Sequence, residues 1–270
     1  GWWPDETSRI AVLMPVYNAG PEIEGTLASL SQQSMPFTLV LVDDGSARKP
    51  DYRKLLEGID YHLIELPRNV GVNEVRNPGL EYILAENFDL ICLIDCGDRA
   101  KPARLEAQTQ FLLANTHVAI AGSWVEMIYE DGGRYVVEFP SGAGNIRRAM
   151  FSNMPVCHPA LMIRPDVFRK IGRYSKEFEA AEDYDMILRA AEAGFGIDNA
   201  QAVLLEKYET RNSVSWKKRK AQLASRLALQ WRYRDLSEPT CIKGLVKTGL
   251  LRATPDRAVR QIKTLLGRQA

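Results

Sequence analysis

The sequence predicts an α/β fold with a mostly parallel central sheet and flanking helices, followed by a basic helical extension. Three observations support this prediction. Short apolar runs alternate with stretches of helical spacing, polar turn residues follow four of those runs, and the chain from Lys217 onward is basic and helical in pattern. Strand–helix alternation at this rhythm is typical of βαβ units, in which parallel strands share one sheet.

Length and composition limit the class of protein. A chain of 270 residues suits one large α/β domain or two small ones. Its apolar runs all fall short of the roughly 20 residues of a spanning helix. Because the start has no secretory pattern and the four cysteines form no CxxC pair, we expect a cytoplasmic protein with reduced thiols. The first residue is Gly rather than Met, so we expect the chain to be part of a longer one.

Five apolar runs are expected to form buried strands, because they are continuous rather than alternating. They are residues 9–15, 37–43, 61–66, 89–95 and 117–122. The intervening stretches have helical spacing: residues 21–33, 51–59, 72–87 and 102–115. Pro78 lacks an N–H group inside the third of these, so that helix is expected to kink or to begin late.

Polar residues follow four of the expected strands. The segments are PVYN, DDGS, PRNVG and DCGD. In open parallel sheets, ligands bind outside the carboxyl ends of the strands, so these segments predict a ligand site at one edge. The chain contains neither GxGxxG nor GxxxxGK[ST], which argues against a dinucleotide-binding fold and against a P-loop ATPase.

The DCGD segment has two interpretations. Asp95 can cap backbone N–H groups in a strand-end turn, with Gly97 supplying a positive φ. Alternatively, Asp95 and Asp98 can bind Mg²⁺ or Mn²⁺, since hard cations often combine one or two carboxylates with substrate phosphates and waters.

Other candidate residues also have a structural and a functional interpretation. The acids of EDYD (182–185) suit a first helical turn, yet an Asp beside a pocket can serve as a general base. His158 precedes an apolar run and fits either a buried core histidine or a ligand. Arg76 and Arg211 fit solvated surface charges or diphosphate-binding guanidinium groups.

The motifs, in order, resemble those of the family 2 glycosyltransferases with the GT-A fold. The resemblance covers roughly residues 8–216 and rests on seven segments: PVYN, VDDGS, RNVGVNEVRNPG, LIDCGD, HPALMIRPDVFRKIGRYS, AEDYDMILRAAEAG and RNSVS. It implies a glycosyltransferase domain over residues 1–216 and a basic extension over 217–270. Within the domain, 8–100 would be the nucleotide-binding half and 101–216 the acceptor half.

The resemblance also implies the donor contacts. Pro15, Val16 and Tyr17 would line the nucleotide pocket, with the aromatic ring near the base. Asp44, with Asp43, would hold the base or the ribose. The donor would be a nucleotide-sugar, with a UDP-sugar favoured.

Around the diphosphate, the resemblance implies a metal-dependent reaction. Arg76 and Asp95 would lie near the donor ribose or diphosphate, and Arg211 would lie in a loop that closes over the donor. Asp95 and Asp98 match the ends of the family's metal motif for Mn²⁺ or Mg²⁺, and His158 matches a position near the metal and the acceptor. Gly97 departs from the pattern, because the family usually has Asp at this position.

The implied reaction is inverting transfer to an acceptor hydroxyl, with Asp183 as the catalytic base. The resemblance further implies a glycan or lipid-linked acceptor in bacterial surface polysaccharide or lipid-linked glycan synthesis. A nucleotidyltransferase is one alternative, but PVYNAG carries no basic residue for phosphates. An inactive sugar-binding module is another, and the intact Glu182–Asp183 pair argues against it. Without a recognised reader motif, nucleic acid is not an expected partner.

Charge is segregated along the chain. From Arg211 to the C-terminus there are 15 Lys or Arg and three acids, a net charge of +12, whereas the rest carries 20 bases and 31 acids. LASRLALQWRYR (223–234) and IKGLVKTGLLR (242–252) combine basic residues with apolar ones at helical spacing. This pattern predicts peripheral binding of residues 217–270 to an anionic surface at the inner face of the cytoplasmic membrane. The alternative is that these helices pack on the acidic part of the chain or form a dimer.

Overall fold

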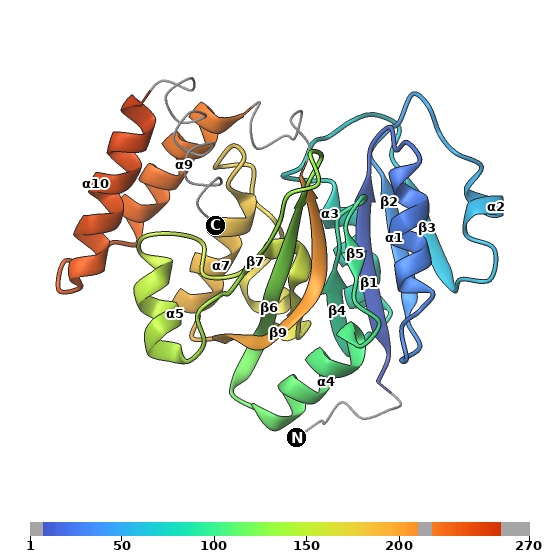
Figure 1. The fold of residues 1–270 in the computed structure, drawn as a ribbon, viewed down its shortest axis with the longest axis horizontal. Helices are drawn as coiled ribbons and strands as arrows, with labels where there is room; N and C mark the ends of the chain where they lie inside the picture. The colour runs from blue at the N-terminus through green and yellow to red at the C-terminus, as the bar shows by residue number, and fades with distance from the viewer. Residues whose placement is uncertain (1–7, 210–217, 255–270) are drawn as a thin grey trace.

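The computed structural model describes residues 8–209 and 218–254. Its centre is a sheet with the order β3-β2-β1-β4-β8-β6-β9-β5 (Figure 1). The first four of these strands are parallel and are β1 (Ile10–Val16), β2 (Thr38–Asp43), β3 (Tyr61–Glu65) and β4 (Leu90–Leu93). The prediction of a parallel sheet from these apolar runs is therefore confirmed.

The other side of the sheet is mixed. Its strands are β5 (Arg99–Ala100), β6 (Val118–Tyr129), β7 (Arg134–Val137), β8 (Met162–Ile163) and β9 (Gly196–Glu209). The short β8 is antiparallel to both β4 and β6, so it separates the run expected at 117–122 from β4. β6 pairs in parallel with β9 and extends beyond residue 122 to Tyr129. Residues 124–129 are mostly β-branched, aromatic or other apolar residues, which favour a strand.

Helices cover both faces of the sheet (Figure 1). Their bounds are α1 (Glu22–Leu30), α2 (Tyr52–Leu55), α3 (Arg76–Ala85), α4 (Arg104–Ala114), α5 (Ala143–Met150), the 3₁₀ turn η1 (His158–Ala160), α6 (Asp166–Ile171), α7 (Glu182–Glu192), α9 (Arg219–Arg232) and α10 (Pro239–Ala253). The helix expected from residue 72 begins at Arg76, two residues before Pro78, which confirms the late start.

Side chains of β1 alternate between two hydrophobic cores. Leu13 packs into a core that includes α3, α6 and α7, whereas Val12 and Met14 pack into a second core with α1 and α4. This alternation follows from the two-residue period of a strand. Since both faces are buried, the strand is held firmly and its polar carboxyl end is fixed in place.

A buried arginine ties α4 to the end of β4. Arg104 Nη2 donates to the carbonyl oxygens of Leu93 at 2.7 Å and Pro159 at 3.0 Å, and Nε donates to Gln108 Oε1 at 3.1 Å. The side chain is fully buried. These bonds fix the end of β4 relative to η1, the two segments that carry Asp95 and His158.

The C-terminal helices pack on the rest of the molecule. α9 contacts α7, and α10 contacts both α9 and α5. Ion pairs join the C-terminal helical region to the rest of the molecule, among them Arg232 with Glu177 and Lys218 with Glu179. Packing on the acidic part of the chain, the alternative considered from the sequence, therefore applies to these helices. Neither they nor any other helix in the described part of the chain is long and apolar enough to cross a membrane.

Candidate active site

One cavity of about 750 Å³ lies at the carboxyl ends of β1 and β4. Its volume is within the usual range of small-molecule sites. Predicted residues from six separate segments line it: Pro15, Val16, Tyr17, Asp44, Arg76, Asp95, His158 and Asp183. Asp43 and Asp98 do not line it, and Arg211 lies outside the described residues. The structure thus brings most of the predicted site together.

Asp44 shapes the side of this cavity that is formed by the loops after β2 and β3. Its Oδ1 accepts from the Val70 N–H at 2.6 Å, and its Oδ2 accepts from the Gly71 N–H at 3.0 Å and from Asn69 Nδ2 at 2.9 Å. The carboxylate therefore folds the loop after β3 against the end of β2. The adjacent Gly45 has φ +66°, and a Cβ there would lie 2.3 Å from the backbone of residue 68, so only glycine fits.

Asp43 lies behind the cavity wall. Its Oδ1 accepts from the Ser46 N–H at 2.7 Å, and its Oδ2 accepts from the Tyr52 hydroxyl at 2.5 Å. The carboxylate is fully buried. Its position indicates that Asp43 organises the turn after β2, whereas Asp44 presents that turn to the cavity.

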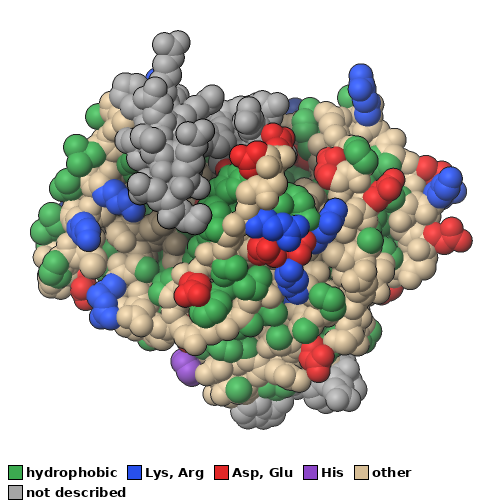
Figure 2. All heavy atoms as spheres, viewed as in Figure 1, with side chains coloured by type: hydrophobic (Ala, Val, Ile, Leu, Met, Phe, Trp, Pro, Cys, Tyr) green, Lys and Arg blue, Asp and Glu red, His purple; other side chains and the backbone are tan. Residues whose placement is uncertain are grey.

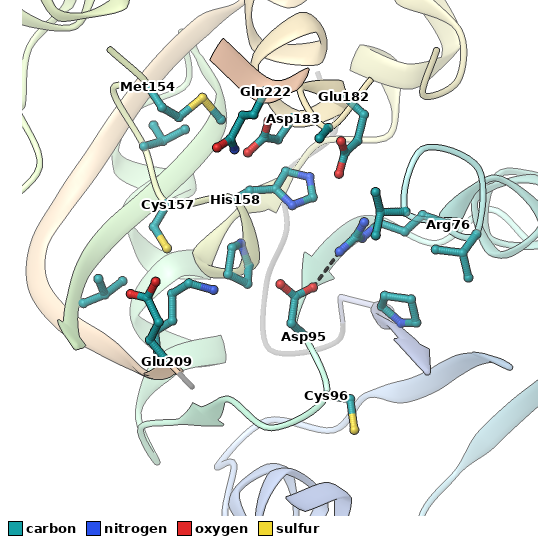
Figure 3. A pocket seen from close by; sticks show the side chains of 18 of the residues that line it. Arg76, Asp95, Cys96, Met154, Cys157, His158, Glu182, Asp183, Glu209 and Gln222 are labelled. Carbon is teal, nitrogen blue, oxygen red and sulfur yellow. Dashed lines mark hydrogen bonds and ion pairs between the residues drawn. The ribbon is translucent and has the colours of Figure 1, made fainter. Parts of the chain in front are cut away.

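An ion pair crosses the floor of the cavity between α3 and the end of β4. Arg76 Nη2 lies 2.6 Å from Asp95 Oδ1, as the dashed line in Figure 3 marks. Burial alone would raise the pKa of Asp95, but the charges of Arg76 and Lys207 outweigh it and lower that pKa to about 2. Asp95 is therefore an anion near neutral pH.

His158 occupies the centre of the site, between the Asp95 side and the Asp183 side (Figure 3). Its Nε2 is 2.8 Å from the Tyr174 hydroxyl. Burial and the charge of Arg76 lower the pKa of His158 to about 3, so the imidazole is neutral near pH 7. A neutral imidazole can exchange a hydrogen bond with a substrate hydroxyl without adding charge to the site.

Asp98 faces a lysine. Its Oδ1 accepts from the Tyr208 N–H at 3.0 Å, and its Oδ2 lies 3.7 Å from Lys207 Nζ. Burial raises the pKa of Asp98 to about 6, although Lys207 opposes the shift. Lys207 itself lines the cavity. Burial would lower its pKa, but Asp98 and Asp95 raise it above the ordinary value, so the side chain is a cation.

The donor set limits how a metal ion can bind. Across residues 8–209 and 218–254, no group of three or more His, Cys, Asp or Glu side chains is placed to hold one. Gly97 has φ +105° and supplies no carboxylate. Asp95 and His158 are the two predicted metal ligands that line the cavity, and Asp95 is the anionic one. Such an ion would take its remaining ligands from phosphates and waters, which is common for Mg²⁺.

Two acids at the start of α7 face the cavity from the other side (Figure 3). Burial and the charge of Asp183 raise the pKa of Glu182 to about 7. Burial also raises the pKa of Asp183, against the effect of the Tyr184 N–H group, which donates to Asp183 Oδ1 at 2.7 Å. Asp185 lies outside the cavity and binds Arg189 Nε at 2.8 Å. The two acids in the cavity, Glu182 and Asp183, are therefore suited to accept a proton near neutral pH.

The sequence analysis missed several lining residues. Gln222 and Arg226 of α9 lie beside the acids, and Arg226 also packs on the Tyr184 ring at 5.7 Å. The spacing of Gln222, Arg226 and Leu229 puts them on one helical face, and this signal could have placed the two polar residues toward the protein. Lys207 could have been found only if the strand β9 had been recognised.

The chain was compared with known proteins. The family model described as "Glycosyl transferase family 2" matches residues 11–172, more than half of the chain. A curated relative in Escherichia coli, the UDP-Gal:alpha-D-GlcNAc-diphosphoundecaprenol beta-1,3-galactosyltransferase, is 25% identical over 212 residues, which are 75% of this chain and 74% of that protein.

Two of the solved structures with a similar fold are complexes with nucleotide-sugars. Staphylococcus aureus TarS 1–349 in complex with UDP-GlcNAc has a TM-score of 0.65 at 18% identity and covers 89% of this chain and 71% of its own. The mannosyltransferase PcManGT of Pyrobaculum calidifontis, in complex with GDP-Man and Mn²⁺, has a TM-score of 0.64 at 17% identity over 91% and 70% of the two chains. The fold is therefore GT-A-like, and the chain belongs to glycosyl transferase family 2.

Proposed function

We propose that this glycosyltransferase moves a sugar from a nucleotide-sugar, with a UDP-sugar favoured, to a hydroxyl group of a glycan or lipid-linked acceptor, and that it inverts the anomeric centre. One observation carries the proposal. A single cavity has hydrogen-bonded strand-end loops and the Arg76–Asp95 pair on one side, and the Glu182–Asp183 pair on the other.

The donor would bind on the side formed by the loops after β1, β2 and β3, which we call the nucleotide side. Tyr17 is 54% exposed and offers a ring face for the base, while Asp44 holds the loop that borders the same part of the cavity. The sugar diphosphate would extend toward Arg76 and Asp95. A divalent cation, Mn²⁺ or Mg²⁺, when held by Asp95, would neutralise charge on the leaving diphosphate.

The acceptor would approach from the α7 side. Its hydroxyl oxygen forms a bond to the anomeric carbon while the bond from that carbon to the diphosphate oxygen breaks, and the hydroxyl proton passes to Asp183. The nucleoside diphosphate leaves from the opposite face, so the configuration inverts without a covalent enzyme intermediate. General-base assistance of this kind is worth about 10²–10⁴ in rate.

The likeness to the E. coli relative supports a lipid-linked acceptor, since that protein's name includes a diphosphoundecaprenol-linked sugar. The surface of α10 supports the same idea. Ile242, Val246 and Leu250 are 52%, 56% and 65% exposed and lie four residues apart, on one face of the helix. Figure 2 shows hydrophobic and basic side chains at the left edge of the molecule, where Figure 1 places α10.

This α10 face would bind an anionic membrane. Its neighbours Lys243, Lys247 and Arg252 are exposed, and each base near an anionic surface contributes about 1 kcal/mol. Sedimentation with anionic and neutral liposomes tests the idea. Replacing the three apolar residues of this face with Ser should abolish binding to anionic vesicles, whereas Val136→Ser, at an exposed apolar position of β7, should not. Equal sedimentation of all three proteins would refute membrane binding.

A panel of nucleotide-sugars tests the transfer itself. Each is incubated with the protein, Mn²⁺ and candidate acceptors, and the released nucleoside diphosphate is measured. Release that needs both the right donor and Asp183 supports the proposal. A rise in melting temperature with a nucleotide-sugar, but no release with any acceptor or with water, would indicate a catalytically inactive binding module.

A further inference from the structure

Lys207 is a cation inside the donor cavity that the reaction described above does not yet use. It lies on β9, and β9 pairs with β6 in parallel along its length. Its side chain keeps 31% of its surface accessible and lines the cavity together with Asp95 and His158. The ammonium group is therefore available to a ligand while the backbone that carries it is fixed in the sheet.

Asp98 holds this ammonium group in position. The Asp98 side chain is only 4% exposed and does not line the cavity. Its Oδ1 accepts from the Tyr208 N–H, and its Oδ2 has no hydrogen-bond partner but lies 3.7 Å from Lys207 Nζ. A buried carboxylate needs a compensating charge, and Lys207 supplies it. Asp98 therefore compensates the charge of Lys207 and does not face the cavity itself.

The two cations of the site are held differently. Arg76 contacts Asp95 at 2.6 Å, a tight ion pair. Lys207 lies farther from its carboxylate, at 3.7 Å, beyond hydrogen-bond distance. Because an ammonium group has three N–H donors, Lys207 keeps the capacity to donate to oxygens within the cavity.

We propose that Lys207 binds the diphosphate of the nucleotide-sugar donor in a chain where Gly97 supplies no carboxylate for a metal ion. The proposal rests on the function proposed above. An ammonium group acts on phosphate oxygens as a point charge, and it would stabilise the negative charge that builds up on the leaving diphosphate. Asp98 then acts as a positioning residue for Lys207, and diphosphate binding does not depend wholly on a metal ion.

Calorimetric titration of UDP and of uridine in EDTA tests this role. Wild-type protein should bind UDP without metal, and Lys207→Met, which keeps the length and removes the charge, should weaken UDP binding by about 10-fold or more, as expected for a lost charge-assisted hydrogen bond. Uridine lacks the diphosphate, so its affinity should be unchanged. Lys207→Arg should retain most of the UDP affinity.

Lys101→Met is the matched control. Lys101 pairs with Glu126 and Glu206 near the same strand but does not line the cavity, so its loss should leave both affinities unchanged. Equal UDP affinity of wild type and Lys207→Met in EDTA, or an equal loss for uridine, would overturn the role of Lys207. If wild type binds UDP only with Mn²⁺, the role of Lys207 falls while the proposed function stands. If wild type binds no nucleotide in either condition, both fall.

Discussion

The two sides of the cavity use carboxylates in opposite ways. On the proposed nucleotide side, both oxygens of Asp43 and of Asp44 accept hydrogen bonds from neighbouring loops and from Tyr52 of α2. On the α7 side, burial raises the pKa values of Glu182 and Asp183. Saturated carboxylates give a rigid binding surface, whereas acids with raised pKa values are suited to proton transfer. The contrast supports the proposal that the donor binds on the first side and that the proton is transferred on the second.

The largest expected effect comes from replacing Asp183, the proposed base. Asp183→Asn keeps the shape of the side chain but cannot accept a proton, so kcat should fall by about 10²-fold or more. Steady-state assays of nucleotide release measure this change. Asp185→Asn is the control two residues away, and it should retain kcat even if it lowers stability through its contact with Arg189. A kcat above about a tenth of wild type would rule out Asp183 as the base.

The dependence of kcat on pH should report the protonation of the two acids on the α7 side. With a carboxyl pKa of about 7 at Glu182 and a raised pKa at Asp183, the pair binds protons as the pH falls below neutrality. A protonated acid cannot accept the acceptor's proton, so kcat should rise with pH as the pair loses its protons. Glu182→Gln removes a neighbouring negative charge and should move this rising limb to lower pH. A profile that is flat from pH 5 to 8 contradicts the assignment.

A substitution on the nucleotide side should lower the stability of the protein. Asp43→Ala leaves the buried Tyr52 hydroxyl and the Ser46 N–H without their acceptor, which should lower the free energy of unfolding by about 1–3 kcal/mol. Urea denaturation measures the loss. Asp60→Ala, at an exposed position that accepts from Thr38, is the control and should change stability by less than about 0.5 kcal/mol. Equal losses would show that Asp43 does not organise the turn.

The smallest expected effect concerns α9. Gln222 lies beside Asp183 in the cavity, so Gln222→Ala should raise KM for the acceptor by about two- to tenfold with little change in donor affinity. Gln201→Ala, at an exposed position of β9, is the control. A larger effect on donor affinity than on acceptor KM would place the donor on this side instead.

The sequence predicted the parts that depend on local pattern. Continuous apolar runs located β1 to β4, and the polar residues after them marked the ligand edge. β8 and β9 were missed because a two-residue strand and a half-exposed strand carry little local signal.

Two details of the site could not be predicted from the sequence, for a related reason. The adjacent residues Asp43 and Asp44 look alike in sequence, and only the positions of Tyr52 and Val70 in space separate their environments. The distance of 109 residues between Asp98 and Lys207 likewise hides their pairing. Contacts across such separations depend on the whole sheet, which local patterns do not describe.

A crossed pair of variants tests the division between binding and chemistry most directly. UDP affinity and single-turnover rate at saturating donor are measured on Asp44→Ala and on Asp183→Asn. The account predicts that Asp44→Ala weakens UDP binding and largely spares the rate, whereas Asp183→Asn spares UDP binding and lowers the rate by about 10²-fold or more. Parallel loss of affinity and rate in both variants would contradict it.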